Sequence, residues 1–130
     1  MIKENKVSLW LGDFKSSEEF AEYVEIKNDE DGNYIKSAFQ EEFDIVRYDL
    51  GTTEKDWISE RCTDVNSLLA GFSCDEEIIP KFEKMINKDK LIKYNSIFLL
   101  YNFEYEISNV INNRMDYIGC VDVNISQFRM

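Results

Sequence analysis

The sequence predicts a single α+β domain that spans residues 1–130, with a mainly antiparallel or mixed β-sheet and about three helices packed mostly on one face. Three apolar segments, at 7–11, 95–103 and 117–123, have the composition of buried strands. Capping residues and helical periodicity predict helices between the segments 7–11 and 95–103. A sheet covered by helices is the layered arrangement that fits this pattern.

The first strand and helix follow directly from residue spacing. Aliphatic residues alternate with Ser and Trp over residues 7–11, which is the period of two of a strand, and Gly12 ends the run. A helix is expected to begin after Ser16, because Glu19 stands three residues later and completes the capping-box pattern. Its inner face is expected to carry Phe20, Tyr23 and Val24.

The middle of the chain has weaker patterns. Ser37 and Gln40 predict the cap of a second short helix. Residues 45–50 are expected to form a short strand, and residues 57–62 an edge strand.

The second half of the chain is predicted to begin with Asp64, which caps a single helical turn that Gly71 ends. A third helix is expected over residues 76–87. Residues 95–103 are apolar almost throughout, which predicts a central strand covered on both faces. Residues 117–123 are expected to pair with it as an antiparallel neighbour.

The net charge is −11, and it is unevenly distributed. Residues 1–65 hold 17 acidic and 8 basic side chains, whereas residues 66–130 hold 9 and 7. Such a field repels nucleic acid and anionic membranes and attracts basic partners, so we expect a protein partner rather than direct binding to nucleic acid or membrane. On charge alone, the favoured interpretation is that the acidity serves only solubility.

Residue usage argues against catalytic, metal and cofactor sites. There is no His, the five glycines are isolated, and the three cysteines are widely spaced. We therefore expect no catalytic residue, no bound metal or cofactor, and three reduced thiols. The acidic turn at 27–33 fails as a calcium loop because Lys27 and Ala38 occupy the first and last ligand positions. The N-terminus lacks the apolar core of a signal peptide, so a cytoplasmic location is expected.

Three acidic groups, two of them beside aromatic side chains, are the candidate contacts for a basic partner. Carboxylates attract Lys and Arg, and an aromatic ring beside them can anchor a contact. The candidate partner-binding residues are Asp29, Glu30, Asp31, Glu54, Asp56, Trp57, Glu60, Glu104, Tyr105 and Glu106.

Three segments carry a resemblance to a known family. They read Val-Ser-Leu-Trp-Leu-Gly-Asp-Phe at 7–14, Glu-Glu-Phe-Ala-Glu-Tyr-Val-Glu-Ile at 18–26 and Leu-Leu-Tyr-Asn-Phe-Glu-Tyr at 99–105. In these segments the chain resembles the immunity protein 22 family of bacterial polymorphic toxin systems. The resemblance implies a cytosolic protein, not an enzyme, that binds and neutralises a cognate toxin domain, often a nuclease, encoded beside it.

Two other functions stay open on the residues alone. An acidic adaptor or nucleic-acid mimic would bind a different basic partner through the same charge. A small enzyme or metabolite-binding domain is the less favoured alternative, and it would need a deep pocket with converging polar groups.

Overall fold

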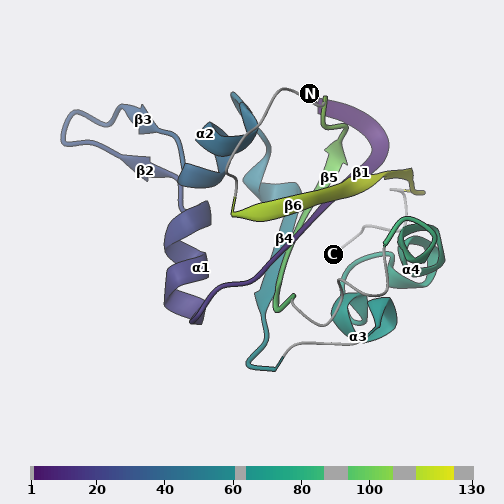
Figure 1. The fold of residues 1–130 in the computed structure, drawn as a ribbon. Helices are drawn as coiled ribbons and strands as arrows, with labels where there is room; N and C mark the ends of the chain where they lie inside the picture. The colour runs from purple at the N-terminus through teal and green to yellow at the C-terminus, as the bar shows by residue number, and fades with distance from the viewer. Residues whose placement is uncertain (1, 61–63, 87–93, 107–113, 125–130) are drawn as a thin grey trace.

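The computed structural model describes residues 2–60, 64–86, 94–106 and 114–124. Within these residues, four antiparallel strands form one sheet in the order β4-β5-β1-β6 (Figure 1). The strands are β1 (Ile2–Gly12), β4 (Thr53–Trp57), β5 (Ser96–Phe103) and β6 (Met115–Asp122). The α+β class and the placement of the three apolar segments in one sheet are confirmed.

The strand order differs from the prediction at one point. β6 pairs with β1 and not with β5, so β1 lies between the two strands expected to be neighbours. The reason is that residues Val7 to Leu11 are buried on both faces of the sheet. A strand with two apolar faces is best accommodated in the interior of a sheet, with a hydrogen-bonded strand on each side.

Helices cover both faces of the sheet, so the prediction of helices mostly on one face was wrong (Figure 1). The alternation along β1 explains this, because the aliphatic side chains at 7, 9 and 11 and the side chains of Ser8 and Trp10 between them are all fully buried, and each set requires its own cover. The helices are α1 (Ser17–Val24), α2 (Ala38–Phe43), α3 (Val65–Leu69) and α4 (Asp75–Glu83), with a two-stranded hairpin of β2 (Lys27–Asn28) and β3 (Tyr34–Ile35) and a 3-10 turn η1 (Leu50–Thr52).

The two faces carry different cores. The aromatic core lies under α1 and α2 and centres on Trp10 and Phe39, whose ring centroids are 5.0 Å apart. The aliphatic core lies under α3 and α4 and contains Leu9, Ile78 and Leu99. Adjacent side chains of one strand therefore enter chemically distinct environments.

The predicted helix caps are present. The Ser16 hydroxyl accepts a hydrogen bond from the Glu19 N–H at 3.1 Å, and Ser37 and Gln40 form a complete capping box. The Asp64 carboxylate accepts from the Ser67 N–H at 2.7 Å. These contacts satisfy backbone donors that a helix leaves unpaired at its N-terminus.

Predictions for the middle of the chain were less accurate. Residues 45–50 do not form a strand; they run as irregular chain into η1. The edge strand is Thr53–Trp57 rather than 57–62, because it is these earlier residues that pair with the free edge of β5. The helix expected over 76–87 ends at Glu83, and residues 61–63 and 87 lie outside the described part of the chain.

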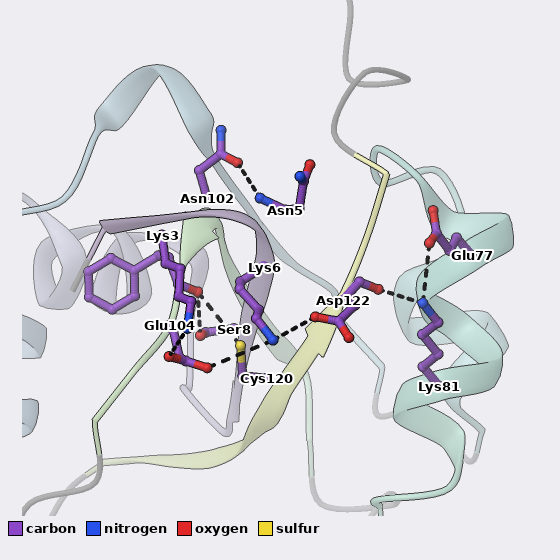
Figure 2. A network of polar contacts seen from close by, with 11 residues as sticks. Lys3, Asn5, Lys6, Ser8, Glu77, Lys81, Asn102, Glu104, Cys120 and Asp122 are labelled. Carbon is purple, nitrogen blue, oxygen red and sulfur yellow. Dashed lines mark hydrogen bonds and ion pairs between the residues drawn. The ribbon is translucent and has the colours of Figure 1, made fainter.

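A polar network fixes the start of β1 (Figure 2). Asn5 and Asn102 both have positive φ, of 62° and 56°, where the pairing of β1 with β5 shifts register. The Asn5 N–H donates to the Asn102 side-chain oxygen at 3.1 Å. Lys6 pairs with Asp122 at 2.6 Å. The bulge ends the regular alternation, so that Phe103 packs in the aromatic core although Tyr101, two residues earlier, packs in the aliphatic core.

Cys74 and Cys120 are free thiols, each partly exposed. Burial raises the pKa of both thiols above the ordinary value, which favours the thiol over the thiolate. Cys62 lies outside the described residues. The expectation of reduced thiols therefore holds for the two cysteines that the structure describes.

Candidate partner-binding surface

The acidic turn predicted from sequence forms the tip of the β2–β3 hairpin, which projects away from the sheet (Figure 1). Asp29, Glu30 and Asp31 are all exposed there. The Asp29 carboxylate accepts hydrogen bonds from the N–H groups of Asp31 and Asn33 at 2.9 and 2.8 Å. The bonds from Asn33 are the main cause that lowers the pKa of Asp29. Asp29 shapes the turn, while Glu30 and Asp31 face solvent.

The acidic group around Trp57 is partly engaged within the protein. Glu54 accepts from the backbone N–H and hydroxyl of Ser73 at 2.8 and 2.5 Å, which ties β4 to the start of α4. The Asp56 carboxylate accepts from the Trp57 N–H. The Trp57 ring is half-buried against the aromatic core, and its Nε1 donates to the Phe14 carbonyl at 3.0 Å. Trp57 therefore has a packing role in the free protein.

The third predicted group is divided between core and surface. Tyr105 is only 8% exposed, and its hydroxyl donates to the Phe43 carbonyl at 2.9 Å. Glu104 pairs with Lys3 at 3.3 Å and approaches Lys6 at 3.9 Å (Figure 2). Glu106 and, near Trp57, Glu60 are exposed. The three groups lie apart in the fold, on the hairpin, along and just after β4, and at the end of β5.

The charge is concentrated more narrowly than the two halves of the sequence suggest. Residues 16–44, here called the acidic lobe, comprise α1, the hairpin and α2 and hold ten acidic and two basic side chains. Their net charge of −8 is most of the total of −11. Residues 64–86, the opposite lobe with α3 and α4, hold five acidic and two basic side chains, a net −3.

A groove of about 520 Å³ lies within the acidic lobe, between α1, the hairpin and α2. Its lining includes the carboxylates of Glu19, Glu22, Glu25 and Glu42, together with Arg114 at the start of β6. None of the residues that line the groove is among the residues predicted as partner contacts. The charge count over residues 16–44 could have indicated this acidic surface from the sequence. The contribution of Arg114 could not be predicted in this way, because 95 positions separate it from Glu19.

Arg114 lines the groove and is held by several contacts. Its guanidinium pairs with Glu19 and lies over the Phe14 ring, 4.4 Å from the centroid. Its backbone N–H donates to Glu42 at 2.7 Å, and Glu42 also accepts from the Tyr23 hydroxyl at 2.8 Å. Burial and this bond to Glu42 raise the pKa of Tyr23 well above its ordinary value, so the hydroxyl remains a donor. A carboxylate beside an aromatic face is a favourable guanidinium site.

Both helices of the acidic lobe end in acidic residues with no basic side chain in the last turn. Glu22 and the C-cap residue Glu25 stand at the end of α1, and Asp44 caps α2 in the left-handed conformation. Carboxylates at a helix C-terminus oppose the helix dipole. α4 shows the favourable arrangement, with acidic residues in its first turn and Lys81 in its last.

Exposed apolar side chains lie beside the groove. Tyr34 and Ile35 on β3 are 37% and 43% exposed, and Ile35 lines the groove itself. The Arg47 guanidinium lies over the Tyr34 ring, 4.9 Å from its centroid. The hairpin therefore presents apolar surface next to carboxylates, a composition suited to binding a protein partner.

Other kinds of site find no support in the described part of the chain. It contains no group of three or more Cys and carboxylate side chains placed to hold a metal ion. None of its helices combines the length and apolar character needed to cross a membrane.

Comparison with known proteins identifies the family. The sequence profile of the immunity protein 22 family matches residues 7–123, which include all the helices that the structure describes and all its strands except the first five residues of β1. No curated protein matches the chain. No solved structure matches it either. Because the family profile covers most of its length, the chain belongs to the immunity protein 22 family.

Proposed function

We propose that the chain binds and neutralises a cognate toxin domain, and that this domain is a basic, nuclease-type protein. The observation that carries the proposal is the family match over residues 7–123, which supports a role in toxin immunity. The net charge of −11 supports the finer statement that the partner is basic. A domain that acts on nucleic acid needs a positive surface to hold phosphates, and an acidic protein is suited to cover it.

Neutralisation requires fast association and slow release. Long-range attraction raises the association rate of oppositely charged proteins, while packed and buried contacts mainly set the dissociation rate. The concentration of charge in residues 16–44 supports a contact through the acidic lobe. The protein would act in the cytoplasm by occupying the toxin's surface, with no catalytic step of its own.

The proposal is tested with the toxin domain encoded by the neighbouring gene. Cells that express this domain alone should die, and cells that also express the chain should survive. A catalytically inactive toxin domain should copurify with the chain as a complex. The proposal fails if the chain gives no protection and no complex forms at micromolar concentrations.

A separate experiment, the displacement of nucleic acid, tests the nuclease-type assignment. If the chain covers the basic surface, adding it should displace a fluorescent DNA or RNA duplex from the inactive toxin domain. The displacement should weaken as the salt concentration rises, because ions screen the attraction between exposed charges. A toxin domain that carries net negative charge, or one that attacks something other than nucleic acid, would contradict this part of the proposal.

A further inference from the structure

We propose that the groove of the acidic lobe receives a lysine or arginine side chain of the toxin domain. Glu22 and Glu25 would pair with its charge, and Ile35 would contact its hydrocarbon stem. This inference rests on the proposed function, and it specifies which surface binds and by what chemistry.

The first support is that a guanidinium of the chain itself already pairs with a carboxylate at the groove wall. Arg114 lines the groove, and its guanidinium pairs with Glu19, another lining residue, and lies over the Phe14 ring. A guanidinium is therefore already paired with a carboxylate at the wall of the groove, an arrangement that charge-assisted hydrogen bonds stabilise. A second cation entering beside Arg114 would need further carboxylates, because Glu19 and Glu42 are engaged with Arg114.

Glu22 and Glu25 supply those carboxylates. They stand three positions apart on α1, so they lie on neighbouring parts of its surface and both line the groove. Both are exposed, and neither side chain forms a hydrogen bond or ion pair with a described residue. Lys27 and Lys36 also line the groove, but neither forms an ion pair with a carboxylate of the described residues.

Their position on the helix gives a second support. Two carboxylates at the C-terminal end of α1 repel each other and oppose the helix dipole, with no basic residue in the last turn to compensate. The arrangement lowers the stability of the free protein. An incoming cation that pairs with Glu22 and Glu25 would relieve both effects at once.

The apolar part of the site is on the hairpin. Ile35 is 43% exposed and lines the groove, with Tyr34 beside it at 37% exposure. Lysine and arginine carry apolar stems that pack on such side chains while the charged head reaches a carboxylate. The groove therefore matches both parts of a long basic side chain.

The test measures the affinity of the inactive toxin domain from the neighbouring gene for matched pairs of variants. Glu22→Gln with Glu25→Gln removes two charges in the groove. Glu76→Gln with Glu83→Gln removes two exposed charges from α4 on the other side of the sheet. We expect the groove pair to raise the Kd at least about tenfold and the α4 pair to change it by less than about threefold.

A second pair of variants tests the apolar contact. Ile35→Ser should weaken binding several-fold, whereas Met85→Ser, at a side chain 48% exposed next to α4, should leave it nearly unchanged. Thermal unfolding serves as the check on folding. The groove charge variant should melt at the same temperature as the unmodified chain or higher, so its weaker binding would not come from a damaged fold.

The outcomes separate this inference from the proposed function. If the unmodified chain neither binds nor protects, both are overturned. If it binds and protects, but the groove variants behave like the α4 variants, the inference alone is overturned and the toxin binds another surface. Weaker binding confined to the groove variants supports both.

Discussion

The two faces of the sheet are packed with different kinds of side chain. Among the described residues, ten of the fourteen buried in the aromatic core carry rings, against three of the fifteen buried in the aliphatic core. The helices above them differ in charge, with a net −8 in the acidic lobe and −3 in the opposite lobe. The rings give a rigid base of interlocked contacts, and that base supports a surface whose charges reduce stability.

The helices on the two faces also differ in how the charges at their ends affect stability. α4 follows the rules of helix stability, with acidic residues at its start and Lys81 at its end. α1 and α2 depart from them at their C-terminal ends. Proteins tend to tolerate such departures where a site needs them. In the opposite lobe the end charges of α4 thus favour the helix, whereas the acidic lobe, with its unfavourable end charges, is the part proposed to bind.

The largest expected effect compares the two cores. Phe39→Ala and Phe82→Ala should each lower the free energy of unfolding by about 3–5 kcal/mol, because both rings are fully buried. Phe39→Leu should cost about 0.5–1.5 kcal/mol more than Phe82→Leu. Phe39 contacts five other rings, including Trp10, whereas Phe82 contacts none among the described residues. Urea unfolding measures both, and equal costs for the Leu variants would remove the distinction between the cores.

The next effect concerns Trp57, which lies at the margin of the aromatic core. Trp57→Phe keeps most of the ring but removes the hydrogen bond to the Phe14 carbonyl, so stability should fall by about 1 kcal/mol. Dissociation of the toxin domain should be unaffected. Faster dissociation at unchanged stability would instead make Trp57 an anchor of the interface, as its acidic neighbours suggest.

A smaller pair of effects should have opposite signs. Glu22→Gln, at the end of α1, should raise the free energy of unfolding by about 0.3–1 kcal/mol. Glu76→Gln, in the first turn of α4, should lower it by a similar amount. Both differences should shrink in 1 M salt. If both substitutions destabilise the protein, the helix-end charges of the two lobes do not differ as described.

The smallest effect is a dependence on pH in the opposite lobe. The Asn124 N–H and Lys81 hold the pKa of Glu77 below its usual value. A lowered carboxyl pKa stabilises the protein above the unfolded value and loses that contribution as the pH falls through the folded value. Glu77→Gln should therefore flatten the loss of stability on acidification from about pH 5 to 3. An unchanged slope would show that Glu77 does not contribute.

Local signals predicted local structure well. Ser16, Ser37 and Asp64 each cap a helix because the cap depends on residues three positions apart in the sequence. Pairing was harder to predict. The central position of β1 depends on apolar residues on both of its faces, and the edge strand Thr53–Trp57 forms because β5 has a free edge, although its own sequence has little strand pattern.

The candidate surface was predictable in charge but not in shape. Counting side chains finds the acidity of residues 16–44, and residues 27–33 were predicted as an acidic turn, without the two short strands that flank it. The groove requires Arg114, brought to Glu19 by the pairing of β6 with β1. Tyr105 was predicted at the surface from its acidic neighbours, yet the bulge at Asn102 directs the chain so that this ring is buried.

Amide hydrogen exchange of the chain, free and bound to the inactive toxin domain, tests most directly whether the acidic lobe is the binding face. The account predicts slower exchange on binding over α1 and the β2–β3 hairpin, residues 17–35, with α3 and α4 unchanged. Slower exchange confined to residues 64–86, with the hairpin unaffected, would contradict it.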